Sequence, residues 1–411
     1  ISRPFFANFI QEEQAKIAER TRQMIKDRVG SYTELKVALQ HPENATPDRL
    51  RLAKNLGAFA LSLQWVGGDA AKAEKSFFKI NQKATLIDPT ELEMINARHK
   101  ANALATRALI RAGTGHKYWS AFQQSTQQEI EKIAREVYDV LFRPAIETPI
   151  KTLDLPVAGR GYSADSVKMV FDLVNFVNHV PTKGELADDT DGTNTLKYLR
   201  AVRRVALHIA GTEPESLGLH PVVYFYGATG KFQSSAFLAA VAFVEELESR
   251  KAFAKFTGAR SRFEEFLLRY RHFINQVGRN YGAGQRGVNA ILMMYNGVLS
   301  GVVDLKSDDA IIKELQGKPE LRFLAEITLE DKNYGKNFSR ETKSAAYLRE
   351  AMDKELRCKI CGARLHFKSI SIDHRIRREE GGPGTEDNAQ LTHPYCNTGY
   401  KESIQAKGAS D

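Results

Sequence analysis

All three cysteines of this chain lie near its C-terminus, at a spacing that limits the possible fold more than any other feature. Cys358 and Cys361 form one pair with two residues between them, and His393 and Cys396 form a second pair with the same spacing. Two such pairs are the usual way in which a chain supplies a tetrahedral structural zinc site. A redox CxxC pair is the alternative, but no strand–motif–helix context supports it. We therefore predict a zinc-bound module and a reducing compartment.

A second group of polar residues lies between and just after these ligands. It consists of Asp373, His374, Asn388, Asn397 and Lys401. Hydrolysis of a phosphodiester needs a base that takes a proton from water and a cation that stabilises the developing negative charge. Histidine ordinarily titrates near neutral pH, and Asp and Asn offer the oxygen atoms that Mg²⁺ or Mn²⁺ prefers.

The order and spacing of both groups resemble the HNH endonuclease family, in the branch whose ββα-metal core is clamped by a zinc knuckle. The resemblance implies that His374 is the general base and that Asp373 and Asn397 hold a catalytic Mg²⁺ or Mn²⁺. It also implies that Asn388 fixes the loop and orients the histidine, and that Lys401 lies close to phosphate. His393 replaces the more common cysteine, which a zinc site accepts.

The rest of the chain has mainly helical periodicity. Helices are predicted over 10–28, 89–112, 123–142, 164–180, 194–210 and 231–250, and another from about Ser339 that leads into the first zinc ligand. Strand-like runs are few: 61–66, 222–226 and a hairpin around 365–376. In the tail, a helix is expected to start near Asp387 and to carry Asn388 and Asn397. The predicted fold is a mainly α multidomain protein with a C-terminal ββα-metal (HNH) module.

At 411 residues the chain exceeds the usual size of one domain. We predict four parts: a ParB-like or helical domain over 1–155, a helical domain with a basic stretch over 160–305, a charged linker and handle helix over 306–350, and the nuclease domain over 351–411. Gly- and Pro-rich residues 153–162 form the first predicted joint. Because the chain begins with Ile1 rather than Met, we expect a segment to precede it.

Residues 76–83 contain an FxxIN pattern formed by Phe77, Ile80 and Asn81. The pattern resembles ParB-like domains of the DGQHR group and of GmrSD-type restriction proteins, although the DGQ[QH]R motif of those domains is absent. The resemblance implies a role in restriction or anti-phage defence. The alternative is an asparagine that caps a turn after a buried strand.

The net charge of +9 is unevenly distributed. Residues 250–286 contain nine Lys or Arg and two Glu, whereas 351–411 contain ten Lys or Arg and nine Asp or Glu. We predict that Arg260, Arg262, Arg269 and Arg271 bind DNA phosphates. The alternative is a solvated helix face whose aromatic residues point into the core.

These patterns predict a cytoplasmic, metal-dependent DNA endonuclease with structural Zn²⁺ and catalytic Mg²⁺ or Mn²⁺. DNA is the expected partner. A nucleotide, or a protein that regulates cutting, is considered as an additional partner. No run of residues is apolar and long enough to span a membrane. A non-catalytic zinc-ribbon protein that binds nucleic acid is the alternative. An NTP-hydrolysing switch is disfavoured because the sequence has no GxxxxGK[ST] motif.

Overall fold

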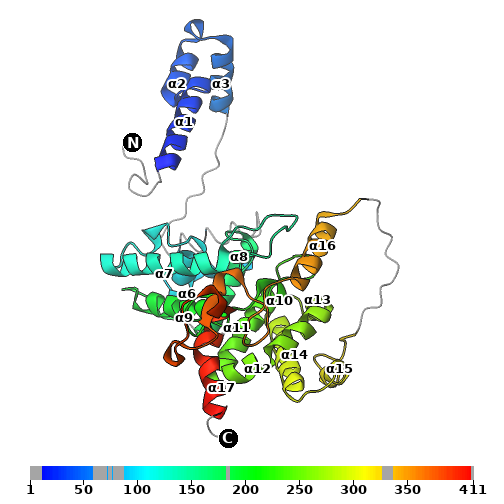
Figure 1. Ribbon diagram of the computed structural model, residues 1–411. Coiled ribbons are helices and arrows are strands. Elements are labelled where there is room, and N and C mark those ends of the chain that lie inside the picture. The colour runs from blue at the N-terminus through cyan, green and yellow to red at the C-terminus, as the bar shows by residue number, and fades with distance from the viewer. Residues whose placement is uncertain are drawn as a thin grey trace. The chain divides into compact units, whose positions relative to one another are not determined.

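The computed structural model describes residues 12–58, 72, 76, 88–181, 186–325 and 337–408. The chain forms two compact units, Ile1–Asp88 and Pro89–Asp411, which are shown in Figure 1. The predicted strand over 61–66 and most of the FxxIN segment lie outside the described residues.

The first unit is a small helical unit made of α1 (Glu12–Arg28), α2 (Tyr32–Gln40) and α3 (Pro47–Ala58). The predicted N-terminal helix is thus confirmed. Ser31 starts α2 by accepting a hydrogen bond from the Glu34 backbone N–H, while the Glu34 side chain accepts one from the Ser31 N–H. This reciprocal capping satisfies N–H groups that the first turn of a helix leaves free. Leu35 and Ala53 bury the contact between α2 and α3.

The second unit is a helical body that carries the C-terminal module. Its helices are α5 (Pro89–Asn96), α6 (Ala101–Ile110), α7 (Gln124–Phe142), α8 (Ala164–Val177), α9 (Thr193–Ala210), α10 (Pro221–Tyr224), α11 (Ser234–Ser249), α12 (Phe253–Arg269), α13 (His272–Tyr281), α14 (Gln285–Val303) and α15 (Asp308–Gln316). Most predicted helices of this region are confirmed to within a few residues. The range 89–112 forms two helices, α5 and α6, rather than one.

Helix α11 lies at the centre of the body because its sequence is apolar on nearly every side. Its residues from Ser235 to Val244 are all buried, and α9, α12 and α14 pack around it. A helix that is apolar all round must be covered by other helices. No helix in the described part of the chain is both long and apolar enough to cross a membrane.

Two sequence-based expectations differ from the structure of the body. Residues 222–226 were expected to form a strand, but Pro221 starts the short helix α10, and only Tyr226 forms an isolated bridge, with Phe232. Proline fits the first turn of a helix because it has no N–H to satisfy. The predicted joint at 153–162 is partly buried: Arg160 and Tyr162 are exposed, whereas Leu155 and Val157 lie in the same core as residues on both sides of it.

The C-terminal module begins with α16 (Arg340–Asp353), which starts where the sequence predicted and is capped by Ser339. Strand β1 (Ser371–His374) then pairs antiparallel with β2 (Ala389–Thr392), and α17 (Lys401–Gly408) follows a π-helical turn. Two predictions for this module are wrong. The strand that pairs with β1 does not lie within 365–376, and no α-helix of the described residues starts near Asp387. Residues 386–388 form a single 3₁₀ turn, because the chain must re-enter the sheet as β2 before the helix can begin.

The four arginines predicted to bind DNA phosphates differ in how deeply the protein buries them. Arg260 is 1% exposed, and its guanidinium donates to Glu264 at 2.7 Å and to the carbonyl oxygens of Leu217 and Gly218. The Tyr224 hydroxyl donates to the same Glu264 oxygen. Arg260 as a DNA contact is therefore wrong, because a buried charge with this many partners cannot reach a ligand outside.

The other three arginines also bind within the protein. Arg269 and Arg262 share Asp308, at 2.6 Å and 3.8 Å. Arg271 donates to the Val222 carbonyl at 2.7 Å, and burial lowers its pKa to about 10. The aromatic residues Phe256, Phe263 and Phe266 are buried in the core, as the alternative interpretation expected. Of the four, Arg269 is the one whose side chain remains mostly exposed.

We predict that Arg260→Ala lowers the free energy of unfolding by about 3–5 kcal/mol, because it leaves the Glu264 carboxylate buried without its cation. Chemical unfolding monitored by circular dichroism measures this. Arg269→Ala removes the same charge from an exposed position and should have a much smaller effect. Equal losses from the two variants would contradict the role assigned to the buried pair.

Candidate active site and metal centre

The two predicted ligand pairs meet in the structure. The ligand atoms of Cys358, Cys361, His393 and Cys396 all lie within 4.8 Å of one another. Three of these side chains are buried and Cys361 is half-buried. Across the described residues, no other His, Cys, Asp and Glu side chains form a cluster of three or more with such spacing. A Cys₃His set of this size is compatible with a structural zinc ion.

The orientation of His393 also fits a metal ligand. Its Nδ1 lies 3.5 Å from the Cys361 sulfur and 3.7 Å from the Cys396 sulfur. Its Nε2 lies 2.9 Å from the Arg364 carbonyl oxygen. A proton on Nε2 donated to that carbonyl leaves the Nδ1 lone pair directed at the thiols, as zinc requires. Burial lowers the pKa of His393, which favours the neutral imidazole that can bind a metal.

The first ligand pair lies in residues 357–364, a turn that we call the knuckle and that is hydrogen-bonded to β2. The Cys358 N–H donates to the Ala363 carbonyl, and the Gly362 N–H donates to the Cys358 carbonyl. The Lys359 N–H donates to the Leu391 carbonyl of β2. Hydrogen bonds from the Cys361 and Cys396 thiols lower the pKa of Cys358. The hydrogen bonds with Cys358 raise the pKa of Cys361 and Cys396, so the thiolate form that binds zinc is favoured at Cys358 alone.

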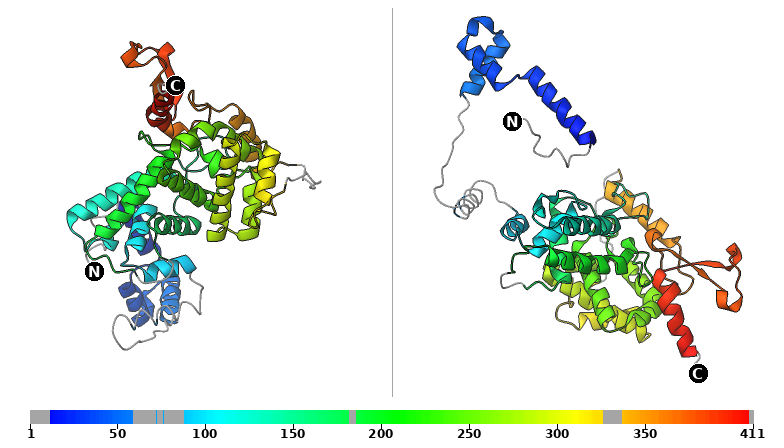
Figure 2. Two further views of the ribbon diagram at one scale, coloured as in Figure 1. Left: turned by 90° about the horizontal axis from the view of Figure 1, so that it is seen from below. Right: turned by 90° about the vertical axis from the view of Figure 1, so that its left-hand side faces the viewer.

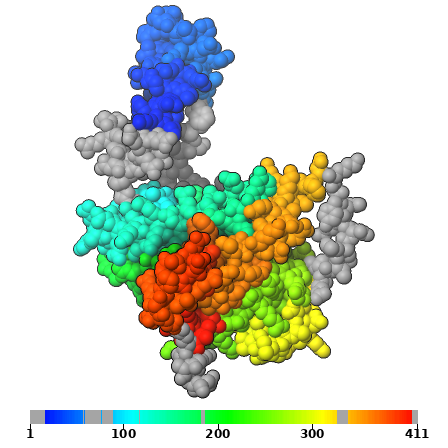
Figure 3. All heavy atoms as spheres, viewed as in Figure 1, coloured from blue at the N-terminus to red at the C-terminus, as the bar shows by residue number. Residues whose placement is uncertain are grey.

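The knuckle is hydrogen-bonded to α12 through Glu264 and Glu265, which were not predicted from the sequence as site residues. The second oxygen of Glu264 accepts the Arg364 backbone N–H at 3.1 Å. Glu265 accepts hydrogen bonds from the Arg364 and Arg357 guanidinium groups at 2.9 Å and 2.8 Å. The sequence did contain a feature that could have pointed to them, since Glu264 and Glu265 are the only acidic residues in the basic stretch. Figure 3 shows the module lying across the body.

A glycine of the body makes a second close approach to the module. Gly218 has a positive φ of 55°, and a Cβ there would lie 2.8 Å from the Ser369 Cβ and 3.2 Å from the His393 ring. Nearby, the Tyr395 N–H donates to the Ser216 carbonyl. The body backbone therefore packs directly against a zinc ligand, at a position where a side chain would not fit.

Asp373 is held in β1 by three hydrogen bonds. The side chain is 5% exposed, and the Lys401 ammonium donates to both carboxylate oxygens, at 2.8 Å and 2.9 Å. The Gln390 amide, opposite Asp373 in the sheet, donates to one of them at 2.8 Å. Gln390 was not predicted as a site residue, and its register opposite Asp373 is visible only once the strands are paired.

His374 is the last residue of β1 and the next side chain along the strand. Adjacent strand residues point to opposite faces, so its imidazole and the Asp373 carboxylate lie on different sides of the sheet. Lys401 also donates to the His374 carbonyl at 2.8 Å. Throughout the described part of the chain, no residue forms a hydrogen bond with the half-buried imidazole. The ring is therefore available to a water molecule or a substrate.

Asn388 fixes the loop that follows His374. Its Oδ1 accepts the Ile376 N–H at 2.7 Å, and its Nδ2 donates to the carbonyls of Ile376 and Pro383 at 3.0 Å and 2.8 Å. Its own carbonyl accepts the Arg375 N–H. One amide thus closes both ends of the loop, which projects from the helical body together with the two strands (Figure 2).

Asn397 follows the zinc ligand Cys396 in the π-helical turn. Its Nδ2 donates to the Ser371 hydroxyl at 2.8 Å and to the Ile372 carbonyl at 3.3 Å. These contacts tie the turn to β1. The zinc cluster therefore helps to place Asn397 beside the strand that carries Asp373 and His374.

We predict that Cys396→Ser removes bound zinc, from about one ion per chain to none, and lowers the unfolding temperature of the second unit. The second effect is expected because the knuckle packs on α12 and Gly218 rather than standing apart. Elemental analysis and thermal unfolding test the two statements. Lys359→Ala changes an exposed residue between the first two thiols and is the control, which should retain the metal. An unchanged zinc content in Cys396→Ser would refute Cys396 as a zinc ligand.

Comparison with known proteins agrees with this geometry. Residues 358–403 match the family model described as HNH endonuclease. No match was found to a curated protein or to a solved structure. The matched range contains all four ligands of the metal cluster and both strands of the small sheet. The C-terminal part of this chain is therefore an HNH domain, a module of a nuclease family that acts on nucleic acids.

Proposed function

We propose that the protein is a metal-dependent DNA endonuclease that hydrolyses phosphodiester bonds. The observation that supports it best is the pair Asp373 and His374 at the end of β1, within a sheet that the Cys₃His cluster clamps. A domain whose task was only to bind zinc would have no need of a buried carboxylate and an available imidazole on adjacent residues of one strand.

In this proposal His374 is the general base. Its imidazole nitrogen accepts the proton that a water molecule loses as it attacks phosphorus. Asn388 acts as a positioning residue, because its carbonyl holds the backbone N–H of Arg375, directly after His374. The loop bonds of Asn388 keep the end of β1 from moving away from the substrate.

The oxygen atoms of Asp373 and Asn397 would hold the catalytic ion, Mg²⁺ or Mn²⁺. Hard oxygen ligands suit these ions, which would stabilise the charge on the phosphate and on the leaving oxygen. Lys401 now neutralises the Asp373 carboxylate. A divalent cation bound there would replace this contact and free the ammonium for a phosphate oxygen.

The same contact favours a second candidate, a zinc-dependent nucleic-acid-binding module without catalysis. A carboxylate whose oxygens are occupied by Lys401 and Gln390 is already satisfied without a metal ion. The two candidates differ in one measurable property. The nuclease binds Mn²⁺ in a way that depends on Asp373, whereas the binding module does not.

A role in restriction or anti-phage defence is the broader part of the proposal. It rests on the resemblance of residues 76–83, which the family comparison does not show and which lies largely outside the described residues. Phage plating on cells that express the wild-type or the His374→Ala protein tests it. Equal plating efficiency on both would count against a defence role.

We predict that His374→Ala lowers the rate of plasmid cleavage by about 10²–10⁴-fold, the usual contribution of a positioned base. Zinc content and unfolding temperature should stay unchanged, since His374 is not one of the clustered ligands. His41→Ala, which removes an exposed histidine of the first unit, is the matched control. Wild-type cutting by the His374 variant in a clean preparation would remove the basis of the proposal.

We predict that chelation with EDTA stops cutting before it removes the structural zinc, and that Mg²⁺ or Mn²⁺ restores cutting while added Zn²⁺ does not. Oxygen ligands exchange their ion readily, whereas thiolates retain zinc. Paired cleavage and zinc assays during chelation follow both events. Asp373→Asn should raise the Mn²⁺ concentration needed for half-maximal cutting. Cutting by the wild-type protein that continues in chelator would exclude a metal-dependent mechanism.

A further inference from the structure

Two neighbouring cavities lie in the helical body and contain none of the HNH residues. One, of about 920 Å³, is lined by residues that include Arg160, Lys231 and Arg279; we call it the cationic cavity. The other, of about 900 Å³, is lined by residues that include Asn102 and Asn175; we call it the amide cavity. Both volumes fall in the range of small-molecule sites.

The two cavities share a wall on α8. Lys168, Asp172 and Ala283 line both of them, and Lys168 and Asp172 form an ion pair at 2.6 Å. Because this pair neutralises itself, it adds no net charge to either cavity. A ligand that crosses this wall would place one part in each cavity.

The cationic cavity carries positive charge that the protein does not balance. Arg160, Lys231 and Arg279 are exposed at its edge, and no ion pair joins any of them to a carboxylate in the parts of the chain that the structure describes. Asp165 is the one further acidic residue in the lining. This contrasts with Arg260, Arg262, Arg269 and Arg271, which bind groups of the same chain. Cations gathered around a cavity attract an anion.

Helix α11 directs its first turn into the cationic cavity. Gln233, Ser234 and Ser235 line it, and no side chain caps this helix, so its first N–H groups are available to an anion. Ser235 is 7% exposed, and its hydroxyl has no hydrogen-bond partner among the described residues. This almost fully buried hydroxyl in the cavity wall is the second, independent indication of a ligand.

The loop between α13 and α14 leaves its backbone open beside both cavities. A Cβ added at Gly282 or Gly284 of this loop, or at Gly278 of α13, would meet nothing within 4 Å. Gly282 has a φ of 70°, and Gly284 precedes α14 without a side-chain cap. A phosphate could approach this backbone closely, as it does where a glycine-rich loop leads into a helix.

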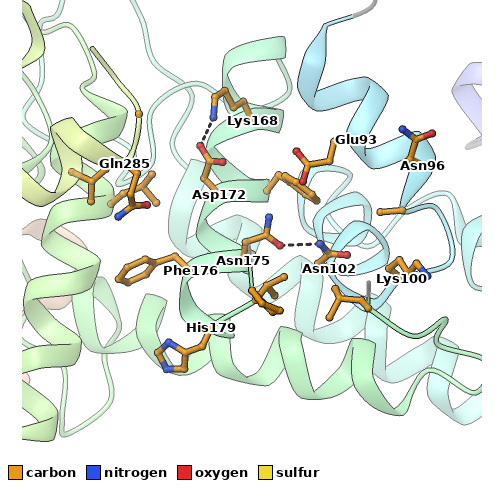
Figure 4. Close-up of a pocket in the computed structure, with 18 of the residues that line it drawn as sticks. Glu93, Asn96, Lys100, Asn102, Lys168, Asp172, Asn175, Phe176, His179 and Gln285 are labelled. Carbon is orange, nitrogen blue, oxygen red and sulfur yellow. Dashed lines mark hydrogen bonds and ion pairs between the residues drawn. The ribbon is translucent and has the colours of Figure 1, made fainter. Parts of the chain in front are cut away.

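The amide cavity offers different chemistry (Figure 4). The Nδ2 of Asn102, a 5% exposed side chain, donates to the Asn175 Oδ1 at 2.9 Å. The Asn175 amide N–H groups have no acceptor among the described residues and can donate to a ligand. Phe176 lies beside Asn175 in the same wall. An amide next to an aromatic ring can bind the polar edge and the face of a nucleobase.

We propose that these two cavities form a nucleotide-binding site, with phosphate in the cationic cavity and the base in the amide cavity. The site is separate from the proposed nuclease centre. Its occupation would be measurable whether or not the protein cuts DNA, so failure of either proposal leaves the other standing.

The test is isothermal titration calorimetry of the full chain carrying His374→Ala, with ATP, GTP, AMP and inorganic phosphate as probes. We expect binding of one nucleotide per chain, with ATP or GTP bound more tightly than AMP. The double variant Lys231→Ala, Arg279→Ala should weaken binding at least tenfold, since hydrogen bonds to charged groups contribute this much. Arg322→Ala, which removes an exposed charge outside the cavities, should bind as before.

Asn175→Ala tests the amide cavity separately. It should change the preference between ATP and GTP while leaving the affinity for inorganic phosphate unaltered. The proposal is overturned if no nucleotide binds to folded protein, if the double variant binds nucleotide as tightly as the Arg322 control, or if only a single-stranded oligonucleotide binds. Circular dichroism of each variant confirms that it is folded.

Discussion

The buried pair Arg260 and Glu264 connects the core of the body to the zinc module. One oxygen of Glu264 accepts the guanidinium and the Tyr224 hydroxyl, and the other accepts a backbone N–H of the knuckle. An isolated charge at such depth would cost several kcal/mol, so each partner requires the other. The module is consequently fixed to a rigid helix, which gives a nuclease site a defined position relative to the body.

A cluster compatible with a structural zinc ion forms the next part of this arrangement. The Cys₃His cluster holds the knuckle against β2 and places Asn397 beside β1, while Asn388 closes the loop on the other side. Each contact restrains the short strand that carries Asp373 and His374. A two-stranded sheet is marginally stable alone. Packing on α12 adds stability that the strands lack, and a metal ion bound by the cluster would add more.

The distribution of charge separates structural from functional cations. Arginines on α12 are directed toward carboxylates and carbonyls of the same chain, whereas Arg160, Lys231 and Arg279 surround a cavity without carboxylate partners among the described residues. The density of positive residues in the sequence therefore does not show which of them are available to an anionic ligand, since Arg279 lies in the basic stretch yet lines the cationic cavity. The DNA surface of the proposed nuclease is better sought around the projecting loop, where Lys401 and His374 lie.

The sequence by itself predicted the Cys₃His cluster, the HNH domain and most helix positions, because these depend on spacing along the chain: two-residue gaps and helical periodicity. It could not determine the role of Arg260, the register that sets Gln390 opposite Asp373, or the helix start at the π-helical turn rather than near Asp387. Those features depend on which segments meet in space. Burial and pairing are properties of the packed structure, so a charge pattern alone could not distinguish a structural arginine from one that binds a ligand.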